Sequence, residues 1–200
     1  MNKQSPMRNL TILLLAICSF YACAQSEPDQ VLTANDEEPQ LSLQEITRNG
    51  GFQKKDLKML IDKSAYTLQV FYKDSLLITY PCVFGFNEID DKHQEGDGCT
   101  PEGEFGIRSM YPHKSWSYFI WVDYPNEESW RRFRARRADG TIKDGATIGG
   151  EIGIHGVPEG ADDLISSRTN WTLGCISLTN KDVTDLYKSI NKYTTMEIVP

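Results

Sequence analysis

Two residues in the C-terminal part of the chain could together supply a nucleophile. His155 follows a short apolar run, and Cys175 follows a glycine twenty positions later. A free thiol has a pKa of roughly 8.5 and is mostly protonated at neutral pH, so it needs a base or a cation beside the sulfur. His155 can be that neighbour. Gly156 and Gly174, which lack Cβ, would let a substrate and backbone N–H groups come close to the pair.

The residues around this pair extend the pattern. Gly156 follows His155 directly, and sixteen residues separate His155 from Thr172. One residue after Thr172 come Gly174 and Cys175. Two isolated residues of these types are more often a buried thiol and a core histidine. The full pattern instead resembles the signature of the L,D-transpeptidase catalytic domain, the YkuD-like family. That family has a His-Gly pair, then 14 to 17 residues, then Ser or Thr, His, Gly and Cys.

Two positions depart from the family pattern. Leu173 stands where the family usually has its second histidine, and Ser177 stands near the usual basic or amide residue. These departures resemble a TLGC-type branch, some of whose members cut murein attachments instead of making them. The resemblance extends over about residues 57–200.

The resemblance implies a reaction on peptidoglycan (murein) stem peptides. Cys175 would attack the carbonyl of the third-position diamino acid, release D-alanine and transfer the acyl group to an amine, with His155 as the acid-base group. It implies no cofactor and no metal. The residues expected to contact substrate or the oxyanion are Gly156, Thr172, Gly174, Ile176 and Ser177. With no second histidine, we expect a backbone carbonyl to orient His155.

Other functions use the same residues or compete with this interpretation. With water as the acceptor, the same thiol would make an L,D-carboxypeptidase or an amidase, and without chemistry the domain would be a murein-binding module. A zinc site is disfavoured, because the three histidines at 93, 113 and 155 are 20 and 42 residues apart and no C-x-x-C occurs. The order His then Cys also differs from that of papain-like proteases.

A second motif lies upstream. The run GDGCTPEGEF, residues 96–105, resembles the family's Gly-Asp-x-x-Thr-Pro-x-Gly element, and Lys92 fits the lysine that precedes it. Pro101 fixes φ and Gly103 admits a positive φ, which predicts a rigid turn with a scaffold role.

The N-terminus predicts export. Lys3 and Arg8 precede an apolar run that ends in small residues at Ala22 and Ala24, the order of a secretory signal over residues 1–24. Cys23 allows lipoprotein processing as an alternative, and membrane association would then come only from this lipidated cysteine. Residues 25–50 are expected to be a flexible linker and residues 51–200 the catalytic domain. We therefore expect a periplasmic or envelope-associated protein.

Composition sets further limits. The chain has 200 residues, 40% of them hydrophobic, which suffices for one domain with a proper core. Removal of the expected signal, residues 1–24, takes away Lys3 and Arg8. The rest of the chain has 19 basic and 28 acidic residues, a net charge of −9. Such an acidic chain does not favour nucleic-acid binding, and we expect a monomer. Cys82 and Cys99 could pair or stay as two separate thiols.

The remaining pattern predicts a mainly β fold, an antiparallel sandwich or barrel-like sheet with a few short helices. Alternating apolar runs predict strands. They lie at residues 57–62, 66–72, 76–85, 104–111, 115–125, 151–157 and 194–200. Short helices are expected within 41–51, after Asn126 and after Thr179 or Asn180. The five arginines that follow Asn126 would form a solvated helix face or reach substrate carboxylates.

Overall fold

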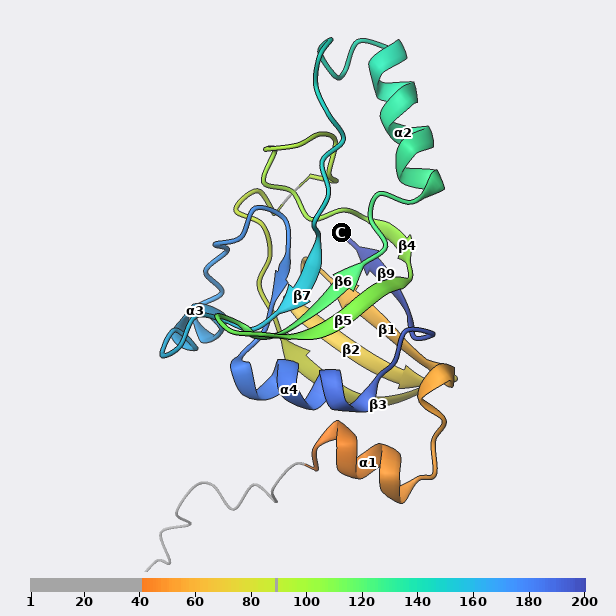
Figure 1. Cartoon of the computed structure of the whole chain (residues 1–200), viewed down its shortest axis with the longest axis vertical. Helices are drawn as coiled ribbons and strands as arrows, with labels where there is room; N and C mark the ends of the chain where they lie inside the picture. Colours follow the sequence, from red (N-terminus) through yellow and green to blue (C-terminus); the bar gives the residue numbers. More distant parts are fainter. Residues whose placement is uncertain (1–40, 89) are drawn as a thin grey trace, which may run out of the picture. The chain divides into compact units, whose positions relative to one another are not determined.

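The computed structural model describes residues 41–88 and 90–200. The expected signal over 1–24, Cys23 and most of the expected linker lie outside these residues. Two sheets form the centre of the described unit, and they lie one in front of the other in Figure 1. Within the described residues no helix is both long enough and apolar enough to span a bilayer.

The first sheet has the strand order β3-β2-β1-β9-β4. Its strands are β1 (Leu57–Asp62), β2 (Thr67–Tyr72), β3 (Ser75–Pro81), β4 (Gly103–Phe105) and β9 (Thr195–Val199). The β1–β2 and β2–β3 pairs are antiparallel hairpins, as the sequence predicts. β9 runs parallel to β1, because the chain returns to this sheet through a long crossover.

The second sheet has the order β5-β6-β7-β8. Its strands are β5 (Ile107–His113), β6 (Ser117–Val122), β7 (Gly153–His155) and β8 (Ile176–Ser177). The expected strand over 104–111 is divided, since β4 and β5 belong to different sheets and Gly106 lies between them. The mainly β fold is confirmed, but the pairs β1–β9 and β7–β8 are parallel rather than antiparallel.

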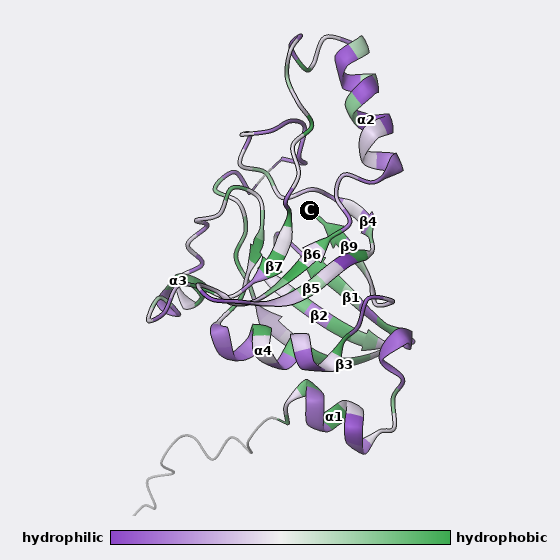
Figure 2. Cartoon of the chain, in the orientation of Figure 1, coloured by the Kyte–Doolittle hydropathy of each residue, from purple (hydrophilic) through white to green (hydrophobic). Residues whose placement is uncertain are grey.

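Alternation along the strands builds the core. Leu57, Met59 and Ile61 of β1 are buried while the residues between them face outward, and β9 repeats the pattern. Figure 2 shows the hydrophobic residues concentrated in the strands of both sheets and the hydrophilic ones on the helices. Helix α4 (Asn180–Ser189) buries Val183 and Leu186 against this core. Its N-cap is Thr179, one of the two residues expected to cap it.

Helix α1 (Leu43–Asn49) corrects the expected domain boundary. Ser42 and Glu45 form a capping box at its start. Leu43 is fully buried, and its N–H donates to the Asp185 carboxylate of α4 at 2.7 Å. Residues 41–50 therefore belong to the folded unit and not to a flexible linker. A 3-10 helix η1 (Lys54–Asp56) leads from α1 into β1.

Candidate active site

The parallel pair β7–β8 brings the two expected catalytic residues to one place. Ile154 is the register partner of Ile176, and His155 is the partner of Ser177, so Cys175 lies just beyond β8 in line with Gly153. Alternation sends Ile154 and Ile176 into the core, and His155 and Cys175 to the opposite face. They occupy diagonal positions on adjacent chain segments, and both line the same cleft.

Cys175 carries a protonated thiol. Burial raises its pKa to about 11, although the nearby Gly153 backbone and the Lys92 charge act in the opposite direction. The Sγ–H donates to the Glu151 carbonyl oxygen at 3.5 Å. Within the described residues no hydrogen bond joins Sγ to His155. The resting site is therefore a neutral thiol and not a preformed thiolate–imidazolium pair.

His155 carries a neutral imidazole of defined tautomer. Its residue is 2% exposed, and this burial lowers its pKa to about 4. The ring Nδ1 lies 2.7 Å from the Gly156 carbonyl oxygen. Because a carbonyl only accepts, Nδ1 holds the proton and Nε2 keeps its lone pair. The expectation that a backbone carbonyl orients this ring is confirmed.

Aromatic rings surround the imidazole. Trp116 stacks on His155 with ring centroids 4.5 Å apart, Phe119 lies parallel at 5.8 Å and Trp171 meets it edge-on at 5.6 Å. His113 also stacks on Trp116, with ring centroids 4.5 Å apart. The sequence predicts a strand at 115–125 that contains Trp116 and Phe119, but it does not indicate this role. Trp171, immediately before Thr172, could have been inferred from its position next to the motif.

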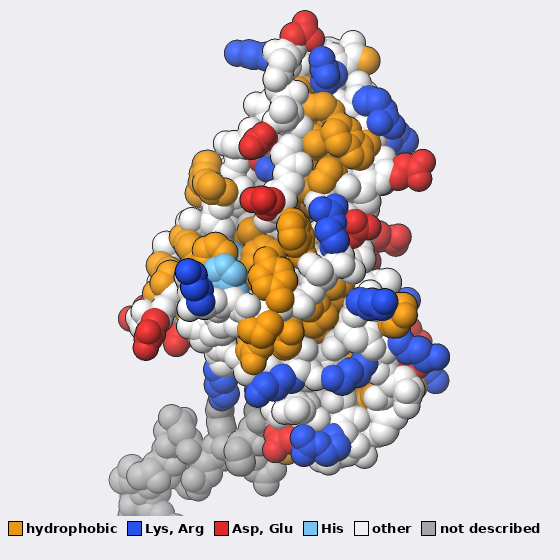
Figure 3. Space-filling model, in the orientation of Figure 1, with side chains coloured by type: hydrophobic (Ala, Val, Ile, Leu, Met, Phe, Trp, Pro, Cys, Tyr) orange, Lys and Arg blue, Asp and Glu red, His pale blue; other side chains and the backbone are white. Residues whose placement is uncertain are grey.

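A cleft of about 700 Å³ contains both expected catalytic residues. Its lining combines aromatic and charged side chains with one leucine: Tyr111, His113, Trp116, Phe119, Trp121, Trp171, Lys92, Glu95, Glu151 and Leu173. Figure 3 shows a band of hydrophobic side chains on the face over β5, β6 and β7. The nucleophile candidate is therefore accessible from a groove, even though it is half-buried.

The turn before Cys175 is tied together by Thr172. The Thr172 hydroxyl donates to the Cys175 carbonyl at 2.7 Å and accepts the Gly174 N–H at 3.1 Å. Gly174 has φ 132°, and a Cβ there would lie 2.6 Å from the Cys99 carbonyl oxygen. The Thr-x-Gly-Cys spacing thus has a structural cause, because only glycine fits between this turn and the 96–105 loop.

Several N–H groups expected to hold the oxyanion already donate hydrogen bonds within the fold. The Gly156 N–H donates to the Trp116 carbonyl at 3.0 Å, and the Ser177 N–H donates to the Val83 carbonyl at 2.8 Å. Gly174 donates to Thr172 as described, and Ile176 is fully buried in β8. In this structure the N–H groups of Gly156, Gly174 and Ser177 are therefore not free to hold an oxyanion. The Cys175 N–H itself forms no hydrogen bond within the described residues, so it remains as a donor.

The 90–105 loop is a scaffold, as its sequence predicts. The Asp97 carboxylate accepts the Lys92 ammonium at 2.8 Å and the N–H groups of His93, Gln94 and Cys99 at 2.7, 2.9 and 3.0 Å. Although burial opposes it, these donors hold the pKa of Asp97 below its ordinary value. The loop in turn supports Gly174 through the Cys99 carbonyl.

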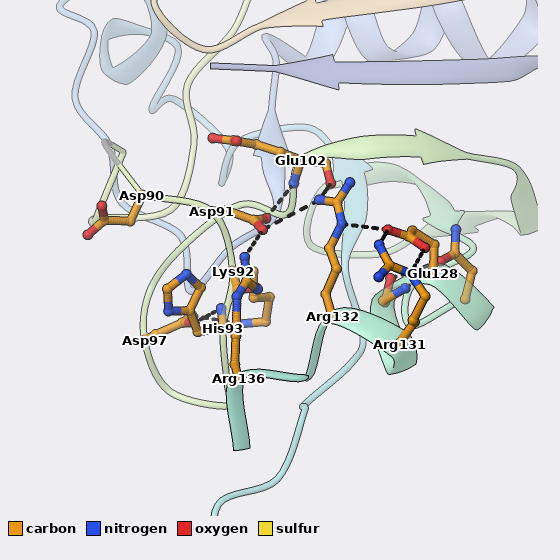
Figure 4. A network of polar contacts seen from close by, with 12 residues as sticks. Asp90, Asp91, Lys92, His93, Asp97, Glu102, Glu128, Arg131, Arg132 and Arg136 are labelled. Atoms are coloured by element: carbon orange, nitrogen blue, oxygen red, sulfur yellow. Dashed lines mark hydrogen bonds and ion pairs between the residues drawn. The ribbon is translucent and has the colours of Figure 1, made fainter. Parts of the chain in front are cut away.

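Helix α2 (Glu127–Ala138), capped by Asn126, is fastened to this loop by ion pairs, which Figure 4 shows. Arg136 contacts Asp91 at 2.7 Å and the Lys92 carbonyl at 3.1 Å. Arg132 contacts Asp91 at 3.6 Å. Arg132 and Arg136 therefore hold α2 against the loop. In this structure they pair with a carboxylate of the protein itself, so they are not free to bind one of a substrate.

Cys82 and Cys99 are both buried free thiols, so the disulfide alternative is not realised. Burial raises the pKa of Cys99 to about 11 and that of Cys82 further, so both remain protonated at neutral pH. Neither lines the cleft.

A family model for the L,D-transpeptidase catalytic domain, YkuD, matches residues 57–198. The chain belongs to this family. The YkuD match starts at the first residue of β1 and ends within β9, so it takes in both sheets and the whole candidate site. No curated protein matches the chain in a sequence comparison.

Two solved structures share the fold of this YkuD domain. Bd1075 of Bdellovibrio bacteriovorus is 20% identical with a TM-score of 0.52, over 75% of this chain and 49% of that one. The helical cell shape determining protein Pgp2 of Campylobacter jejuni is 22% identical with a TM-score of 0.52, over 71% of this chain and 46% of that one. The chain thus spans about half the length of these relatives.

The two departures from the YkuD pattern have different surroundings. Leu173 is 74% exposed at the edge of the cleft, where the family usually presents a histidine. Ser177 is fully buried beside His155, and its hydroxyl has no partner within the described residues. Ser177 therefore has no access to a substrate in this structure.

Proposed function

We propose that the protein is an exported cysteine acyltransferase that acts on peptidoglycan stem peptides, with Cys175 as nucleophile and His155 as general acid-base. The observation that carries this proposal is the β7–β8 register, which turns both side chains into one cleft. Family membership supports murein as the substrate class. Residues 1–24 are proposed as the export signal.

The pKa values select the mechanism. At neutral pH the Cys175 thiol is protonated and the His155 ring is neutral. Nε2, the nitrogen left free by the Gly156 contact, takes the thiol proton as Sγ attacks the carbonyl carbon of the third-position diamino acid. Diagonal neighbours reach each other through a rotamer change or one water, and catalytic hydrogen bonds often tighten only when substrate binds.

The following steps return the proton. The bond to the terminal D-alanine breaks, and the proton on Nε2 moves to the leaving amine. An acceptor amine then attacks the thioester carbonyl, gives its proton to Nε2, and releases Sγ, which regains a proton from the ring. The Cys175 N–H would donate to the oxyanion in both steps.

Hydrolysis is the second candidate, with water in place of the acceptor amine. Leu173 favours it, because an apolar side chain at the edge of the cleft offers no hydrogen bond to hold an acceptor amine near the thioester. An enzyme that holds its acceptor gains effective molarity over water. An enzyme that does not hold it releases the free acid.

One product assay separates the candidates. The protein is incubated with disaccharide tetrapeptide, with and without a second stem peptide as acceptor, and the products are weighed by mass spectrometry. A cross-linked dimer supports the acyltransferase, and tripeptide alone supports the hydrolase. Unchanged substrate under all conditions contradicts both and leaves a murein-binding module.

A further inference from the structure

One end of the first sheet gathers exposed cations from five segments. The residues are Arg48 of α1, Lys54 and Lys55 of η1, Lys58 of β1, Lys73 of the β2–β3 turn, and Lys188 and Lys192 around the end of α4. All seven are exposed. None of them belongs to a salt bridge within the described residues, whereas α2 pairs four of its five arginines with carboxylates.

The contacts of these segments place the cations together. Lys58 is the register partner of both Phe71 and Thr195, so β1, β2 and β9 meet beside it. Lys54 donates through Nζ to the Lys188 carbonyl, which joins η1 to α4. In Figure 3 Lys and Arg side chains gather over the lower part of the view, around the elements that Figure 1 labels α1 and α4. We call this end the basic end.

Exposed apolar side chains accompany the charges. Tyr193 is 64% exposed beside Lys192, whose ammonium lies 5.0 Å from its ring centroid, and Leu76 is 51% exposed next to the turn that holds Lys73. Tyrosine among lysines is typical of residues that sit at a membrane–water interface. The same segments hold three exposed carboxylates, Glu45, Asp56 and Asp74, against the seven cations. In a chain with an acidic net charge, this end is therefore locally cationic.

We propose that the basic end docks on the anionic headgroups of a lipid bilayer. Each Lys or Arg near an anionic leaflet adds favourable energy, so a cluster of this size binds without a lipid anchor of its own. The exposed Tyr193 and Leu76 support a bilayer over a soluble polyanion, because a membrane interface accepts apolar side chains beside cationic ones.

Binding to lipid vesicles tests the proposal. The protein used begins at residue 25, because the apolar run within residues 1–24 would itself insert into the vesicles. Vesicles of phosphatidylcholine with and without one part in three phosphatidylglycerol are pelleted with the protein at low and high salt. We expect binding to the anionic vesicles only, and its loss in high salt. Equal binding to both vesicle types, or none to the anionic ones at low salt, would overturn the proposal.

Matched charge reversals locate the surface. The variant Lys55→Glu, Lys58→Glu, Lys192→Glu changes three positions of the basic end, and Arg134→Glu, Lys143→Glu, Lys181→Glu makes the same net charge change elsewhere. We expect the first to lose roughly 100-fold in partitioning and the second to lose far less. Equal losses of vesicle binding in the two variants would contradict the assignment. Tight binding of soluble polyphosphate by a protein that does not bind vesicles would contradict it as well. Equal melting temperatures confirm that both variants fold.

Discussion

The ring of Trp116 lies on the ring of His155, with centroids 4.5 Å apart and planes within 24°. This contact, together with Phe119 and Trp171, removes the imidazole from water and lowers its pKa to about 4. The site therefore keeps a neutral base at any pH above that value. The aromatic cover, rather than a charged partner, sets the protonation state of the proposed base.

Replacement of Trp116 by Ala should move the acid limb of the pH–activity profile. Water would reach His155, and the pKa of the ring would rise from about 4 toward its ordinary value of 6.5. A base must be unprotonated, so activity in the variant should fall below about pH 6 while the native protein stays active there. NMR titration of the ring gives the pKa directly. An unchanged value would show that Trp116 does not keep water from the ring.

The same burial makes stability depend on pH. The unfolded chain binds a proton at His155 below pH 6.5, whereas the folded chain does so only below about pH 4. The unfolded state thus holds more protons in this window, and the free energy of unfolding should fall by about 3 kcal/mol as pH drops through it. Denaturant titrations of the native protein and of His155→Gln measure the effect. If the free energy of unfolding of His155→Gln depends on pH as steeply as that of the native protein, the effect belongs to other groups.

Gly156→Ala should destabilise the fold. A Cβ at this position would lie 2.1 Å from Asn180 Oδ1 and 2.7 Å from the Trp116 carbonyl oxygen, so the β5–β6 turn would have to move. We expect a loss of about 3 kcal/mol, at the upper end for overpacking. Gly106→Ala is the control, because its Cβ would meet nothing nearer than 4.0 Å. Thermal melts that give the same shift for both variants would contradict the packing role of Gly156.

Thr172→Val should impair catalysis more than stability. Valine keeps the shape but loses the bonds to the Cys175 carbonyl and the Gly174 N–H, which fix the turn that presents the thiol. We expect kcat to fall roughly tenfold or more, since a small misplacement of a reacting group is costly. Thr172→Ser keeps both bonds and should retain most of the activity. Loss of activity in the serine variant as well would point to the methyl group instead of the hydroxyl.

Much of the fold was predictable from local pattern. The run at residues 57–62 has an apolar residue at every second position, 57, 59 and 61, and the structure confirms it as β1 with the same bounds. The parallel pairs were not predictable, because β9 reaches β1, and β8 reaches β7, only through crossovers whose path depends on tertiary packing.

The candidate site was predictable in its residues but not in its surroundings. His155 and Cys175 could be singled out because the His-Gly pair and the Thr-x-Gly-Cys run at this spacing resemble the YkuD signature. The stacking of Trp116 on His155 depends on the β5–β6 turn folding over β7, which no local pattern encodes. The hydrogen bonds of the Gly156 and Gly174 amides were not predictable, because sequence shows that a glycine permits close approach but not what approaches it.

The central claim is that Cys175 forms a bond to the substrate, and the mass of the intact protein tests it most directly. The protein is mixed with disaccharide tetrapeptide, quenched in acid within seconds, and weighed beside Cys175→Ala. We predict a mass increase equal to the substrate less D-alanine, located by peptide mapping at Cys175 and missing from the alanine variant. Turnover of the substrate by Cys175→Ala, or an adduct on Cys82 or Cys99 instead, would contradict the account.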